Sequence, residues 1–210
     1  MRQKHFRVMI FVALLAALPS AAWAEPFRIV GFGDSLMAGF GLQPGEAFPD
    51  RLAVALKAKG HDVEIQNAGV SGDTTSGGLS RLDWSVPEGT RLVILELGAN
   101  DMLRGVDPAV TEANLDKMLS QLKQRGIRVL LAGMRAAPNL GPDFQQRFDS
   151  IYPRLAQKYG VELYPFFLDG VAADRSLLLD DGMHPNRTGI DRMVERALPV
   201  VEKMLPATDG

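Results

Sequence analysis

A serine and a histidine in two distant loops could together form a nucleophile and its general base. Ser35 lies in GDSL (33–36), directly after a short apolar run. His184 lies in DGMHPN (181–186), where Asp181, three residues before the histidine, can turn back to accept the imidazole Nδ1–H. That bond selects the tautomer whose Nε2 is free to take a proton from a serine hydroxyl.

Two other loops hold hydrogen-bond donors that such a reaction could use. Gly72 lies in NAGVSGD (67–73), and a glycine can offer its backbone N–H without a side chain obstructing the approach. Asn100 lies in GAND (98–101) and carries an amide donor. A pair of donors near a serine is what an oxyanion hole requires. Each residue alone also fits a common turn or helix cap, so only the combination points to catalysis.

The other two histidines are poorly placed to act as the base. His5 lies in the segment predicted below to be removed. His61 lies in a turn between a predicted helix and a predicted strand, which puts it at the opposite edge of the sheet from the four loops. His184 is therefore the expected base.

Alternating strands and helices must position these loops. Short apolar runs predict five strands, at residues 27–31, 62–66, 92–97, 127–131 and 161–164. Helical spacing predicts helices at 48–59, from Asp107-Pro108 to near Gly126, at 144–159, and after Asn186. This alternation indicates an α/β fold of three layers, a parallel sheet between two layers of helices, whose functional loops follow the carboxyl ends of the strands.

Composition excludes several classes of protein. The chain has 210 residues, 46% of them hydrophobic and 23% charged, which is typical of one globular domain. It has no cysteine, which rules out disulfides, thiolate metal sites and a cysteine nucleophile. The formal net charge of −2 gives no basic footprint for nucleic acid. We expect no metal and no organic cofactor.

The first 24 residues read as a signal peptide. Arg2, Lys4 and Arg7 form a basic segment before an apolar run at 8–18, which is shorter than the roughly 20 residues needed to span a bilayer. Small residues at Ala22 and Ala24 predict cleavage after Ala24. We therefore expect a single mature domain, residues 25–210, that is periplasmic or secreted, monomeric and without stable membrane insertion.

The four motifs together resemble the SGNH (GDSL-type) hydrolase family. The matching stretches, GDSLMAGFG, NAGVSGDTTSGGLSRL, LGAND and DGMHPN, extend over nearly the whole mature chain. The resemblance implies a flavodoxin-like sheet order 2-1-3-4-5, Ser35 as nucleophile, Asp181 and His184 as its partners, and an oxyanion hole formed by Ser35, Gly72 and Asn100. The stretches GDSLMAGFGL, AAPNLG and IYPRLAQKYGVELYPFFLDGV are similar to the periplasmic arylesterase and thioesterase–lysophospholipase branch of the family.

The resemblance implies a serine esterase acting on small ester or lipid substrates, such as aryl esters, fatty acyl esters, lysophospholipids or thioesters. A carbohydrate O-deacetylase would use the same catalytic residues and is the alternative, while a non-catalytic binding protein should have lost at least one of them. Apolar side chains on the loops favour an acyl groove. Its expected lining is Met37, Met102, Leu140 (in the loop 136–142) and Met183. We expect Leu36 and Leu103 to pack beneath the loops, Asp34 to have a structural role, and Arg81, Trp84 and Arg104 to pack at the surface.

Overall fold

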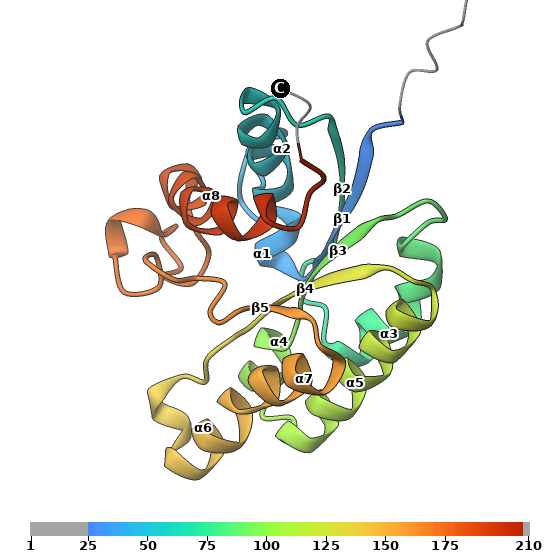
Figure 1. Cartoon of the computed structure of the whole chain (residues 1–210). Helices are drawn as coiled ribbons and strands as arrows, with labels where there is room; N and C mark the ends of the chain where they lie inside the picture. Colours follow the sequence, from blue (N-terminus) through green and yellow to red (C-terminus); the bar gives the residue numbers. More distant parts are fainter. Residues whose placement is uncertain (1–24, 208–210) are drawn as a thin grey trace, which may run out of the picture.

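A computed structural model describes residues 25–207. The predicted signal peptide lies outside the described residues, as do residues 208–210. Five parallel strands form one sheet in the order β2-β1-β3-β4-β5, which confirms the predicted topology (Figure 1). The strands are β1 (Phe27–Gly33), β2 (Val63–Gly69), β3 (Leu92–Glu96), β4 (Arg128–Ala132) and β5 (Glu162–Tyr164).

Helices cover both faces of the sheet, so the three-layer prediction is confirmed. One face carries α1 (Ser35–Ala38), α2 (Phe48–Ala58) and α8 (Arg187–Glu202) (Figure 1). The other carries α3 (Thr75–Ser85), α4 (Ala99–Leu103), α5 (Pro108–Gln124), α6 (Pro142–Asp149) and α7 (Ile151–Tyr159). Within residues 25–207, no helix combines the length and the apolar character needed to cross a membrane.

All five strands end at the same level of the sheet. Gly33 of β1 is in register with Gly69 of β2 and with Glu96 of β3, and the register continues through Ala132 of β4 to Tyr164 of β5. Because parallel strands share one direction, the loops that follow these residues gather at one edge. This alignment brings distant sequence motifs together.

The sheet is held by apolar packing on both faces. Every residue of β3 is buried, as expected for a strand covered by helices on each side. Phe32, Phe48 and Phe148 are among the largest fully buried side chains. Burying each such ring contributes roughly 1.5–3 kcal/mol to the free energy of unfolding, relative to leaving it exposed. This packing holds the ends of the strands in place.

The prediction of one helix over 144–159 is wrong. The structure has two helices, α6 and α7, separated at Ser150. Pro153 explains the break, because proline has no N–H to donate to the carbonyl four residues earlier and its ring clashes with that carbonyl. At the break, the Asp149 side chain accepts the Ala136 N–H at 2.7 Å.

Helix α3 was not predicted from the sequence, since its two consecutive glycines have poor helix propensity. Tertiary packing overrides that propensity. A Cβ added at Gly78 would lie 2.3 Å from Leu97 Cδ1, so the glycine permits close approach to the sheet. Thr74 caps the helix by accepting the Gly77 N–H.

Candidate active site

Ser35 is the first residue of α1, directly beyond the carboxyl end of β1. The preceding Asp34 caps this short helix, with Oδ1 accepting the Leu36 N–H at 3.0 Å. Gly33 permits the tight transition from strand to helix, because a Cβ there would lie 2.8 Å from the Met37 Cβ. The turn presents the Ser35 hydroxyl at the sheet edge.

His184 reaches Ser35 from the loop between η2 (Arg175–Leu177) and α8. Its Nε2 lies 2.8 Å from the Ser35 Oγ, and its Nδ1 lies 2.5 Å from the Asp181 Oδ2. The structure therefore brings together the three residues that the sequence proposed as a triad. His61 lies elsewhere, with Nε2 3.3 Å from the Glu202 Oε1.

Asp181 is held as a carboxylate by its own loop. Oδ1 accepts the backbone N–H groups of Met183 at 2.9 Å and His184 at 3.0 Å, and Oδ2 faces the imidazole. These hydrogen bonds, that from the His184 backbone foremost, lower the pKa of Asp181 to about 2. The group is therefore ionised near neutral pH, so it can orient the imidazole and stabilise its charged form.

Phe40 covers one face of the histidine. Its ring centroid lies 4.5 Å from that of His184, with the two rings tilted by 37°. Packing of the two rings helps to hold the imidazole in its orientation. Phe40 was not predicted from the sequence to lie in the site.

Asn100 lies in the first turn of α4 and lines the same cavity as Ser35. Its Nδ2 donates to the Asp34 Oδ2 at 3.0 Å. A side-chain amide has two N–H groups, so one remains available to the cavity that Asn100 lines. The structure thus places Asn100 on the wall of the same cavity as Ser35.

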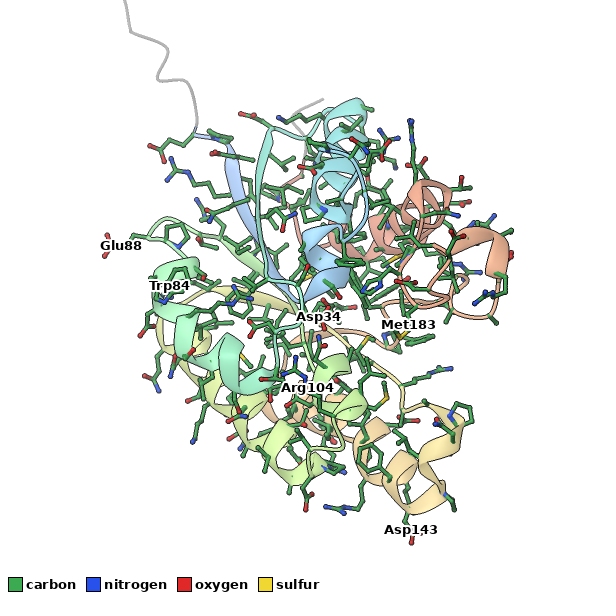
Figure 2. The ribbon with its side chains drawn as sticks, turned by 180° about the vertical axis from the view of Figure 1, so that it is seen from behind. Asp34, Trp84, Glu88, Arg104, Asp143 and Met183 are labelled. Atoms are coloured by element: carbon green, nitrogen blue, oxygen red, sulfur yellow. The ribbon has the colours of Figure 1, made fainter. Side chains whose placement is uncertain are left out.

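Gly72 also lines this cavity and adopts φ +81°, a left-handed conformation that other residues rarely accept. Its carbonyl accepts a hydrogen bond from Arg104 Nη2 at 2.7 Å, which fixes the loop. Arg104 thus contacts the site, contrary to the expectation of simple surface packing. Figure 2 shows Arg104 below Asp34 and Met183, in the middle of the molecule.

Arg81 is buried, so the expectation that it packs at the surface is wrong. Its guanidinium donates to the Gly33 carbonyl at 2.8 Å, to the Ala68 carbonyl at 2.8 Å and to the Asp73 carboxylate at 2.7 Å. It therefore joins the ends of β1 and β2 to the loop that carries Gly72. Trp84 is 75% exposed and remains a surface residue.

A second carboxyl group lies beneath Asp34. Glu96, the last residue of β3, is completely buried, and its Oε2 accepts the Asp34 N–H at 3.2 Å. Burial raises the pKa of Asp34 to about 6, and burial beside Asp34 raises the pKa of Glu96 well above its usual range. The two groups share one environment and do not ionise independently.

An apolar cavity of about 550 Å³ opens beside Ser35. Eight of the eighteen residues that line it have large apolar side chains: Leu36, Phe40, Met102, Leu103, Met134, Leu168, Leu178 and Met183. Met102 and Met183 therefore lie where the sequence analysis expected them. Leu36 and Leu103 were expected to pack beneath the loops, but both contribute to this wall.

Met37 and Leu140 require correction, because neither lines the cavity. Met37 is fully buried and points into the sheet, filling the space left by two glycines: a Cβ at Gly31 would lie 2.8 Å from its Sδ. Leu140 lies in η1 (Pro138–Leu140) and packs against the edge of the core. Sequence proximity to the motifs placed both residues near the site without giving the direction of their side chains.

Within residues 25–207, no three histidine or acidic side chains are grouped closely enough to hold a metal ion. The arrangement offers an alcohol, an imidazole, a carboxylate and hydrogen-bond donors beside an apolar cavity. These groups can perform acyl transfer to a serine followed by hydrolysis.

Residues 32–192 match the model of the GDSL-like lipase/acylhydrolase family. The chain belongs to this family. The match includes Ser35, Gly72, Asn100, Asp181 and His184, so it covers every segment that forms the site.

Relatives within the family align over most of their length. The arylesterase of Vibrio mimicus is 40% identical over 178 residues, covering 84% of this chain and 88% of that protein. The thioesterase 1/protease 1/lysophospholipase L1 of Escherichia coli is 36% identical over 196 residues, covering 91% of this chain and 92% of that protein. The crystal structure of AlinE4, an SGNH-hydrolase family esterase, superposes with a TM-score of 0.74 at 46% identity. The match covers 89% of this chain and 100% of that chain.

Proposed function

We propose that this family member is a serine esterase that hydrolyses carboxylic esters with apolar acyl or aryl groups. One observation carries the proposal: the hydrogen-bonded series from Ser35 Oγ through His184 to Asp181 lies at the wall of an apolar cavity. Aryl esters, short-to-medium acyl esters and lysophospholipids fit such a cavity, and thioesters share their acyl chemistry. The names of the relatives support the same substrate classes.

The reaction follows from the roles of these groups. His184 Nε2 removes the hydroxyl proton as Ser35 Oγ attacks the ester carbonyl, while Asp181 orients and stabilises the imidazolium. The oxyanion is stabilised by the N–H groups of Ser35 and Gly72 and by the Asn100 amide. His184 then protonates the leaving alcohol, and in the second half it activates water to release the acid from Ser35.

The carbohydrate O-deacetylase alternative is not favoured. A sugar carries many hydroxyl groups, which need polar partners when they leave water. The cavity wall is instead mainly apolar and is formed largely by leucine, methionine, phenylalanine and alanine side chains. An acyl chain or an aromatic ring is a better match to such a wall.

Labelling with a fluorophosphonate tests the nucleophile directly. The probe should modify Ser35, and Ser35→Ala should lose both labelling and hydrolysis of p-nitrophenyl esters. Ser71, which also lines the cavity, gives the matched control: Ser71→Ala should still be labelled at Ser35. Labelling of another serine, or full turnover by Ser35→Ala, would contradict the proposal. Activity should also persist in EDTA.

We also propose that the protein is exported, cleaved after Ala24 and monomeric. The basic and apolar segments before Ala24 support export. Mass spectrometry of the protein recovered from the periplasm or medium should give a chain beginning at Glu25. A chain that retains Met1, or that is found only with the membrane, would contradict this proposal, and light scattering would test the monomer.

A further inference from the structure

Glu96 is a buried acid that the mechanism above does not use. It ends β3 directly beneath the turn that carries Asp34 and Ser35, and none of its surface is exposed. Its register partner is Gly33, and a Cβ at Gly33 would lie only 2.4 Å from the Glu96 Oε2. The glycine therefore leaves room for the carboxyl group to approach the backbone of the turn.

The hydrogen bonds of Glu96 lead toward Asn100. Oε2 accepts the N–H of Asp34 at 3.2 Å, while Oε1 has no hydrogen-bond partner in the described structure. Asp34 in turn accepts the Asn100 Nδ2 at 3.0 Å, and its other oxygen accepts the Leu36 N–H. A series of contacts thus runs from Glu96 through Asp34 to the amide beside the cavity.

The protonation states of the two acids follow from their partners. Two adjacent carboxyl groups that are both buried do not both ionise near neutral pH. Asp34 accepts two hydrogen bonds and faces His184, which favours its charged form. Glu96 accepts a single hydrogen bond and lies beside the charged Asp34 carboxylate. Its pKa is therefore raised, and it is Glu96 that holds the proton. The neutral acid can then support the turn without repelling Asp34.

We propose that Glu96 is a positioning residue of the oxyanion hole. It fixes the turn at Asp34 so that the Asp34 carboxylate holds one N–H of Asn100 and leaves the other directed to the developing oxyanion. The inference rests on the proposed function, because it assumes that Asn100 is an oxyanion donor. Glu96 itself does not touch the substrate.

This role makes a specific prediction about which kinetic constant changes. A loosened Asn100 amide affects the transition state more than the bound substrate, so the loss should fall on kcat and leave KM nearly unchanged. Glu96→Met keeps the length and apolar bulk of the side chain but cannot accept the Asp34 N–H. We expect kcat to fall about 10- to 100-fold, less than the roughly 10²–10³ expected on removing Asn100 itself.

Glu96→Gln is the matched control. Its amide oxygen can accept the same N–H, and the residue is neutral like the protonated acid. This variant should therefore retain kcat within about threefold of the wild type. Glu96→Asp shortens the side chain and should lose kcat as Glu96→Met does. It supplies the measurement if Glu96→Met does not fold, which thermal unfolding of each variant would reveal.

A double-mutant cycle with Asn100→Ala separates positioning from general stability. If Glu96 acts through the Asn100 amide, Glu96→Met should cause no further loss of kcat once that amide is gone. Equal losses in both backgrounds, an effect confined to KM, or unchanged kcat in Glu96→Met would overturn the inference. Failure of the proposed function is distinct: Asn100→Ala would then have wild-type kcat, or Ser35 would not be labelled.

Discussion

The two sides of Ser35 are built in opposite ways. On one side, Asp181 and His184 lie three residues apart in a single loop that organises its own hydrogen bonds, and the Asp181 side chain is 32% exposed. On the other side, Asp34, Glu96 and Asn100 come from three elements and form a largely buried cluster. The proton-transfer side is therefore local, whereas the oxyanion side depends on the register of the sheet.

This difference indicates how each side should fail. A local loop can lose one function while the rest of the molecule keeps its structure. A buried cluster couples catalysis to stability, because each of its polar groups must keep a partner inside the protein. Variants on the two sides should therefore differ in how far a loss of kcat is accompanied by a loss of stability.

The largest effect is expected on the local side. Asp181→Asn should lower kcat by about 10⁴, because an amide favours the wrong imidazole tautomer. The free energy of unfolding of the variant should fall only slightly, since the carboxylate is partly exposed and contacts only its own loop. Steady-state kinetics and thermal melting would check both parts. A near-native rate would mean that a different carboxylate orients His184.

The next effect concerns the oxyanion side. Asn100→Ala should lower kcat by roughly 10²–10³ with little change in KM, because the donor acts mainly on charge that develops in the transition state. It should also reduce the free energy of unfolding, since the Asp34 Oδ2 loses its partner. Kinetics and urea unfolding would measure the two effects. A rise in KM at constant kcat would instead make Asn100 a substrate-binding residue.

A pH titration of stability sharpens the contrast. The pKa of Asp34 is raised to about 6, so the folded chain holds a proton that the unfolded chain releases at lower pH. This contribution to stability is complete below about pH 4 and is lost as the pH rises through 6. Asp34→Asn removes it. Between pH 4 and 6, the wild type should therefore lose free energy of unfolding relative to the variant, on the order of 1 kcal/mol per pH unit.

Urea unfolding at several pH values would measure that difference. A difference that stays flat from pH 4 to 7 would show that Asp34 titrates normally and that the cluster is not coupled to stability. Asp181 should behave in the opposite sense, because its pKa is lowered to about 2. Its stabilising contribution is present above about pH 4 and disappears only as the pH falls through 2.

The smallest effect concerns the cavity that both sides share. Each methylene that reaches an apolar wall contributes about 0.8 kcal/mol, so kcat/KM should rise up to about fourfold per CH₂ from acetyl toward hexanoyl esters. Met183→Ser should reduce this increase. Leu140→Ser, outside the cavity, is the control and should leave it unchanged. A wild-type enzyme that prefers acetyl to every longer ester would contradict the acyl-groove proposal.

The same contrast explains what could be predicted from the sequence. The Asp181–His184 spacing is visible within one loop, and the structure places both residues as expected. The strand order followed from family resemblance and is confirmed. Arg81, Glu96 and Phe40 were missed, because their contacts cross between elements and no local pattern encodes them. A charged residue at the end of an apolar strand, as in LVILE, was the available signal for Glu96.

The direction of side chains was the second feature that could not be predicted from the sequence. Met37 follows Ser35 by two positions, and sequence distance alone suggested a place in the groove. The start of α1 instead turns Met37 toward the sheet, where Gly31 and Gly33 leave space. The glycine-containing α3 depended similarly on packing that propensity does not describe, whereas Pro153 was a local signal for the interruption at Ser150.

The hydrogen bond between Ser35 and His184 joins residues 149 positions apart. A ribosome therefore makes the proposed nucleophile early and its proposed base late, after all five strands. No nascent chain that stops before residue 184 can possess the pair, and a chain passing a membrane pore from its N-terminus gains it only when nearly all of the polypeptide has emerged. The Ser35–His184 pair is thus completed only late in the synthesis of this protein.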